Sequence, residues 1–214
     1  MNRSRGFTLI ELMVAIAVMA LLALMSWRGL DGMARVQTQN RERGDAVLTL
    51  QTSLSQWNAD LDAMVALDQL SALDWDGRAL RLTRRSTDSA SPAIFVVAWT
   101  LSTDATGPRW RRWQSPSITT RAQWRQAWDR AAAWAQDGSN EMRGAEVALM
   151  PLDTWQLLYF RNDLWSPAVS AEALGAGAPL PDGIRLVLNL PPGAALAGQL
   201  TRDWVRPAAS VPKS

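Results

Sequence analysis

The chain contains no cysteine and no histidine, a single tyrosine, and one lysine, Lys213. Without cysteine there can be no disulfide and no thiol nucleophile, so a folded domain must depend on its hydrophobic core. Without histidine as well, Ser-His-Asp triads, zinc fingers and histidine-based zinc sites are excluded. Paired carboxylates and an oxygen-ligand calcium site are the chemistries that the composition leaves open.

The chain also lacks an excess of charge of either sign, because its 214 residues include 22 basic and 20 acidic side chains. The basic residues are almost all arginine, and nothing in this balance indicates a nucleic-acid partner. The chain is instead rich in tryptophan, with twelve residues. We expect most of them to fill the core and its edges, because buried tryptophan removes a large apolar area from water.

A basic leader and a long apolar run open the chain. Arg3 and Arg5 precede Gly6, and the apolar run covers residues 7–25. As a helix this run would be roughly 28 Å long, which is enough to cross the hydrocarbon core of a bilayer. The acid Glu11 lies inside the run. A carboxylate at membrane depth is costly, so we expect Glu11 to have a partner and a function.

Three other kinds of segment share some of these features. A secretory signal peptide has a short apolar core and a small-residue cleavage site, whereas this run is long, contains Glu11 and lacks a convincing site of that kind. A plain membrane anchor explains the length and the cytoplasmic arginines. A buried core helix would not need an acid here. None of the three explains the sequence Gly-Phe-Thr-Leu-Ile-Glu at residues 6–11.

This hexapeptide before an apolar helix resembles the processing signal of type IV pilins and type II secretion pseudopilins. The resemblance implies that a membrane prepilin peptidase cleaves after Gly6 and that the new N-terminal residue, Phe7, is N-methylated. It implies that Glu11 neutralises the terminal amine of a neighbouring subunit during assembly. Arg3 and Arg5 would belong to the leader on the cytoplasmic side.

Residues 27–31, Trp-Arg-Gly-Leu-Asp, are similar to a segment of the minor pseudopilin J family of type II secretion, and residues 54–61 and 185–188 agree more weakly. This resemblance implies a structural subunit without cofactor or metal. Such a subunit joins pseudopilins I and K in a tip complex, is linked through H to the major pseudopilin G, and supports export of folded proteins across the outer membrane. The implied location is the bacterial inner membrane, spanned once, with the globular domain in the periplasm.

Two other functions stay open at this point. One is a minor pilin of a type IV pilus, serving adhesion, assembly initiation or DNA uptake. The other is a membrane-anchored enzyme, for which the carboxylate pairs Asp60/Asp62 and Asp74/Asp76 are the candidates. We interpret the first pair as part of a solvated helix face and the second as turn chemistry. The sequence therefore predicts no catalytic site and no metal site.

The run Arg-Trp-Arg-Arg-Trp at residues 109–113 mixes basic and aromatic residues, as proteins that bind single-stranded nucleic acid do. In a strand, however, Trp110 and Trp113 would lie on opposite faces. That arrangement divides the patch. We therefore expect a half-buried strand with exposed arginines and no nucleic-acid partner.

Apolar periodicity predicts an α+β, pilin-like fold, in which a long N-terminal helix packs on an antiparallel β-sheet domain with one additional helix. The expected parts are a leader (1–6), a membrane-spanning part of the helix (7–30), its periplasmic part (31–67), a globular domain (68–206) and a loose tail (207–214).

The second helix is expected at residues 120–136, with Thr120 and Gln123 as a capping box and Gly138 at the C-terminal cap. Its apolar stripe is expected to consist of Trp124, Ala127, Trp128, Ala131 and Ala135. The expected strands are a hairpin around Asp76-Gly77 and residues 94–101, 109–114, 147–150, 155–160, 184–190 and 201–205. The strand at residues 94–101 is almost continuously apolar and is expected to be covered on both faces, whereas residues 184–190 alternate and should place their apolar side chains on one face.

Overall fold

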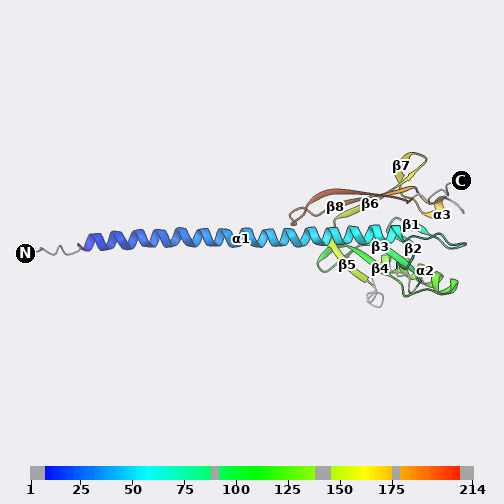
Figure 1. Ribbon diagram of the computed structural model, residues 1–214, viewed down its shortest axis with the longest axis horizontal. Helices are drawn as coiled ribbons and strands as arrows, with labels where there is room; N and C mark the ends of the chain where they lie inside the picture. Colours follow the sequence, from blue (N-terminus) through cyan, green and yellow to red (C-terminus); the bar gives the residue numbers. More distant parts are fainter. Residues whose placement is uncertain (1–7, 88–91, 138–145, 175–178, 208–214) are drawn as a thin grey trace, which may run out of the picture. The chain divides into compact units, whose positions relative to one another are not determined.

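The computed structural model describes residues 8–87, 92–137, 146–174 and 179–207 (Figure 1). The chain divides into two compact units, residues 1–46 and residues 47–214. The described helices are α1 (Leu9–Asp62), α2 (Arg121–Asp137) and the single-turn α3 (Ala171–Leu174). The α+β class is therefore confirmed, because the described residues form nine strands in antiparallel sheets and one long N-terminal helix.

Helix α1 runs unbroken from Leu9 because no proline interrupts it. It ends at Asp62, before the expected boundary at residue 67. The cause is tertiary: after Asp62 the backbone pairs with strand β2 (Ala79–Arg85) instead of continuing its own ladder. The amide of Val65 donates to the carbonyl of Thr83 at 3.0 Å, and the carbonyl of Ala63 accepts from the amide of Arg85 at 2.9 Å.

The first sheet lies in unit 2 and has the strand order β1-β2-β3-β4-β5, all antiparallel. The predicted hairpin is confirmed. Asp76 accepts the amides of Arg78 and Ala79 at 2.9 and 2.8 Å, and Gly77 takes a φ of 91° that favours glycine. The other strands of this sheet are β1 (Leu73–Trp75), β3 (Ile94–Asp104), β4 (Gly107–Gln114) and β5 (Glu146–Pro151).

The second sheet, also in unit 2, has the order β7-β6-β8-β9. Its strands are β6 (Thr154–Arg161), β7 (Leu164–Pro167), β8 (Gly183–Leu190) and β9 (Gly198–Val205). The expected alternation in β8 is confirmed, since Ile184, Leu186 and Leu188 are fully buried. Strand β7 and helix α3 were not among the expected elements. The turn before β7 uses positive φ at Asn162 and Asp163, a hairpin signal that was overlooked.

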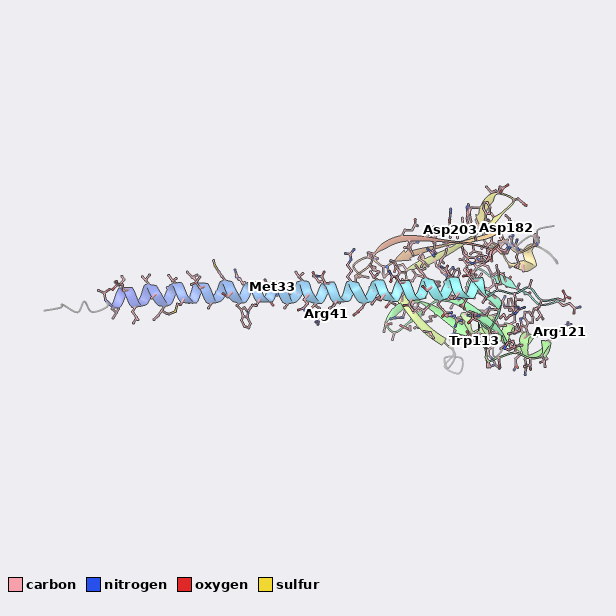
Figure 2. The ribbon with its side chains drawn as sticks, viewed as in Figure 1. Met33, Arg41, Trp113, Arg121, Asp182 and Asp203 are labelled. Atoms are coloured by element: carbon pink, nitrogen blue, oxygen red, sulfur yellow. The ribbon has the colours of Figure 1, made fainter. Side chains whose placement is uncertain are left out.

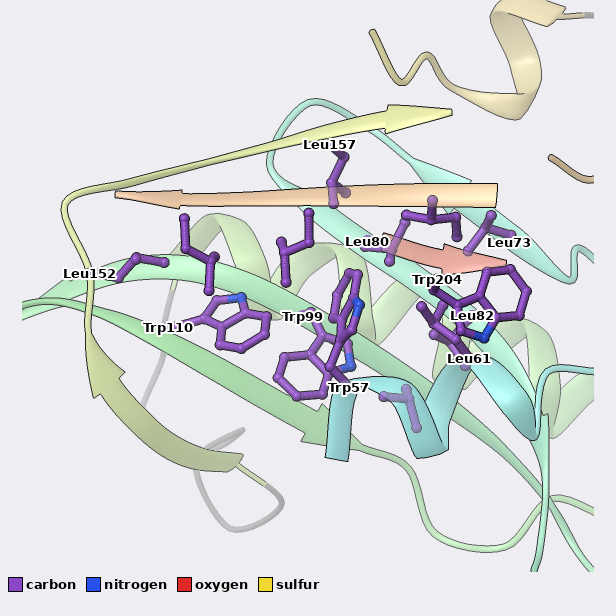
Figure 3. Packing of buried hydrophobic residues seen from close by; sticks show 14 of the residues in the cluster. Trp57, Leu61, Leu73, Leu80, Leu82, Trp99, Trp110, Leu152, Leu157 and Trp204 are labelled. Carbon is purple, nitrogen blue, oxygen red and sulfur yellow. The ribbon is translucent and has the colours of Figure 1, made fainter. Parts of the chain in front are cut away.

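The main core lies between the two sheets and the C-terminal end of α1 (Figure 3). Trp57 and Leu61 of α1 pack there with Trp99 and Trp110 of the first sheet and the apolar face of β8. A second core lies on the other face of the first sheet, under α2. Strand β3 serves both cores through alternate residues, which confirms that this strand is covered on both faces.

Helix α2 begins with the expected capping box. The amide of Gln123 donates to Thr120 Oγ1, and the amide of Thr120 donates to Gln123 Oε1, each at 3.2 Å. Its predicted C-terminal cap, Gly138, lies outside the described residues. The predicted apolar stripe of α2 is confirmed, because its members are buried in the second core: Trp124, Ala127, Trp128, Ala131 and Ala135.

Candidate functional site

The N-terminal end of α1 is built around a contact between Thr8 and Glu11. The carboxylate of Glu11 accepts the amide of Thr8 at 3.2 Å and its hydroxyl at 3.1 Å, and the amide of Glu11 reaches Thr8 Oγ1 at 3.4 Å. This is a capping box, which satisfies amides that the first helical turn leaves unpaired. It also places an anion at the positive end of the helix dipole.

The remaining predicted site residues, Arg3, Arg5, Gly6 and Phe7, lie outside the described residues. Glu11 is exposed within its unit, so its carboxylate is open to a cation from another molecule. The capping role of Glu11 was not predicted, although the spacing Thr-x-x-Glu before an apolar run is the usual signal for it.

The apolar side chains of α1 before Met25 face outward on every side of the helix within unit 1. Leu9 and Met25 are 77% and 70% exposed, and the large apolar residues between them are similar. The helix is long and apolar enough to cross a membrane, and a helix that is apolar all round suits lipid as its solvent. Trp27 follows the run and is 73% exposed, as in an interfacial aromatic belt.

Asp60 is not on a solvated helix face, and that prediction is wrong. It is fully buried and accepts hydrogen bonds from three strands of the first sheet. Arg112 is bidentate to it at 2.7 and 2.8 Å, the indole of Trp99 donates at 2.9 Å, and Arg84 forms a third ion-paired contact. Its neighbour Asp62 is exposed, as expected, and accepts the Trp204 indole at 2.8 Å.

Two of the three arginines in residues 109–113, Arg111 and Arg112, are not free either, which corrects the expectation of exposed arginines. Arg111 is 7% exposed and forms ion pairs with Asp104 and Glu146, while Arg112 is bound to Asp60. Trp110 and Trp113 lie in the two different cores, as the strand periodicity predicts. The run therefore presents no aromatic surface on which bases could stack.

Comparison with known proteins gives one match to a short N-terminal motif and one match along almost the whole chain. Residues 1–27 match the family model of the prokaryotic N-terminal methylation motif. Type II secretion system protein J of Escherichia coli is 24% identical over 217 residues, covering 96% of this chain and 98% of that protein. The chain therefore carries the N-terminal methylation motif and is similar to type II secretion system protein J over almost its whole length.

A second relative supports this similarity. Type II secretion system protein J of Klebsiella pneumoniae is 30% identical over 103 residues, which cover 48% of this chain and 43% of that protein. The matched motif includes Gly6, Phe7 and Glu11, the three residues expected to serve processing and assembly.

The carboxylates that were weighed as catalytic candidates have structural partners. Asp74 is largely buried, pairs with Arg81 and accepts the amide of Ala171 at 2.8 Å. The carboxylate of Asp76 accepts the amides of Arg78 and Ala79 within its own turn. Within the part of the chain that the structure describes, no three acidic side chains gather as a metal site would require.

Proposed function

We propose that the chain is a structural subunit of the pseudopilus tip in type II secretion. It would join the minor pseudopilins I and K, contact H, and so prime a fibre of the major pseudopilin G that supports export of folded proteins across the outer membrane. The observation that carries this proposal is the similarity to secretion protein J over almost the whole of both chains, together with the methylation motif.

The proposed processing follows from the motif. A prepilin peptidase would remove residues 1–6, with Arg3 and Arg5, by cleavage after Gly6, and Phe7 would then be N-methylated. The mature amine would be a cation one helical turn from Glu11. Glu11 would neutralise the amine of a neighbouring subunit, since an ionised carboxylate in a membrane is stable only with a partner.

The proposed location is the inner membrane. Residues 7–30 would span it, residues 31–67 would lead into the periplasm, and residues 68–206 with the tail at 207–214 would lie there as the globular part. The exposed apolar run and its single candidate span support this placement. A minor pilin of a type IV pilus is the less favoured function, because both relatives carry secretion names.

The experiment that tests the function is deletion and complementation in the source bacterium. Loss of the chain should trap exported proteins in the periplasm, and the wild-type chain should restore their release. Normal export without the chain would overturn the proposal. In the same strain, mass spectrometry of the membrane-extracted protein should find N-methylated Phe7. An intact leader, or a cut beyond Met25, would contradict the proposed processing.

A further inference from the structure

The two sheets of unit 2 have four edge strands, and three of them carry features that discourage pairing with another strand. β1 has three residues, and β7 has four and ends at Pro167. β5 ends at Pro151, and a register shift interrupts its pairing with β4. Short length, proline and bulges are the usual protections of a sheet edge.

Strand β9 has none of these protections. It has eight residues without proline and pairs with β8 in one continuous register from Gly198 to Val205. Within the described residues, no backbone hydrogen bond joins β9 to any segment other than β8. Such an edge is a template for an additional strand.

The strand is also held rigidly, which lowers the entropic cost of binding to it. Arg185 of β8 is bidentate to Asp203 at 2.7 Å for both contacts, and the same guanidinium lies 4.3 Å from the ring centre of Trp165 (Asp203 is labelled in Figure 2). The hydrogen bond from Arg185 holds the pKa of Asp203 below its usual range. At the end of the strand, Arg206 donates its amide to Asp182 at 2.8 Å.

Charge and exposure along β9 define what could pair with it. Asp203 is neutralised by Arg185, whereas Arg202 is exposed and has no partner among the described residues. Val205 is 70% exposed on the opposite face from Arg202, because side chains alternate along a strand. An added strand would therefore meet one free cation on one face and one apolar side chain on the other.

We propose that β9 pairs with an extended segment of a different pilin-like subunit, one that carries an acid opposite Arg202 and an apolar residue opposite Val205. This inference rests on the proposed function, since it takes the partner from the same fibre. The acid and the apolar residue would be three positions apart in the partner strand, which places them on opposite faces as required.

A second copy of the same chain does not meet this requirement. When two β9 strands pair with their core faces on the same side, even positions lie opposite even positions, whether the strands are parallel or antiparallel. The even positions of β9 are Gly198, Leu200, Arg202 and Trp204, none of which is acidic. Asp203 lies on the other face in this arrangement, so pairing between two β9 strands supplies no acid opposite Arg202.

The test uses the fact that the chain has no cysteine. Full-length Gln199→Cys and Thr201→Cys variants, both at exposed β9 positions, are labelled with a thiol-reactive benzophenone in membranes of the complemented strain and irradiated. The matched control is Gln156→Cys, an exposed position on β6 in the interior of the same sheet. We expect an adduct with another pilin-like subunit from the β9 positions and none from the control.

Charge variants of Arg202 test whether the partner strand carries an acid opposite this residue. Arg202→Glu should lower the adduct yield from Thr201→Cys about fivefold, because a like charge replaces an opposite one across the strand pair. Arg202→Lys should keep the yield. Equal adducts from the control, an adduct of two copies of this chain, or an adduct with an exported protein would each overturn the inference.

Secretion measured in the same strains separates the two proposals. If export depends on the chain but β9 gives no adduct, the edge-pairing inference is wrong and the proposed function stands. If β9 gives the expected adduct but export does not depend on the chain, the edge pairing stands and the secretion role is wrong.

Discussion

At the scale of single residues, Asp60 is the charge that the fold is least able to lose. It lies in the last turn of α1, where the helix dipole already leaves partial negative charge. A carboxylate buried there is stable only because Arg84 and Arg112 neutralise it and the Trp99 indole occupies a further lone pair. The cluster joins the end of the helix to three strands at once.

We expect Asp60→Asn to destabilise the full chain by roughly 3–5 kcal/mol, because it leaves two buried guanidinium groups without their anion. Chemical unfolding in detergent micelles, followed by tryptophan fluorescence, measures this. The control is Asp62→Asn, which keeps an oxygen acceptor for Trp204 at an exposed position and should cost about 1 kcal/mol or less. Equal losses for the two variants would contradict the role of the cluster.

Glu11 has two separable tasks, capping α1 and carrying a charge. We expect Glu11→Ala to insert and be cleaved normally but to reduce co-purification with partner pseudopilins about tenfold, equivalent to about 1.4 kcal/mol. Glu11→Gln keeps an oxygen that can cap the helix but removes the charge, so it should fail in the same way. If Gln assembles like the wild type while Ala does not, capping rather than charge is what assembly requires.

At the scale of elements, α2 shows how local chemistry sets a helix end. Thr120 and Gln123 satisfy each other's amides, and the helix then covers the outer face of the first sheet with tryptophan and alanine. The cap does not depend on the sheet, so it could be predicted from four residues of sequence.

We expect Thr120→Ala to lower the free energy of unfolding by about 1 kcal/mol, through loss of an N-cap. Thermal unfolding of the full chain measures the change. Ser117→Ala, at an exposed loop position just before the helix, is the matched control and should leave the midpoint unchanged. A similar shift of the unfolding midpoint for both variants would show that the loss of stability comes from the loop rather than from the N-cap.

At the scale of the whole of unit 2, Trp57 of α1 contacts aromatic rings of both sheets. Its ring centre lies 5.3 Å from that of Trp99 and 5.6 Å from that of Trp110 in the first sheet, and 6.4 Å from that of Trp155 in the second. The Trp57 ring meets those of Trp99 and Trp155 edge to face, a geometry that favours aromatic pairs. Figure 3 labels Trp57, Trp99 and Trp110 in this core. The two sheets therefore both contribute to the main core, which lies between them.

We expect Trp57→Ala to cost about 3–5 kcal/mol and to raise amide hydrogen exchange in both sheets together. Trp128→Ala, which opens the second core under α2, should raise exchange in α2 and the first sheet only. Exchange that stays local to one sheet after Trp57→Ala would contradict a shared core.

Much of this protein was determined by sequence alone, because the signals are local. The start of α2, the Asp76-Gly77 turn, the alternation in β8 and the opposite faces of Trp110 and Trp113 depend only on neighbours along the chain. The N-terminal methylation motif belongs with them, since it is a continuous segment of sequence, matched over residues 1–27.

The tertiary structure alone decided which charges are buried. Asp60 meets Arg84 and Arg112 across 24 and 52 residues of sequence, and nothing near any of the three distinguishes it from a solvated charge. It also decided that the strands form two sheets and that β9 is left as an open edge. Such outcomes depend on which distant segments pack together, and the free energy of that packing belongs to the assembled core rather than to any local pattern.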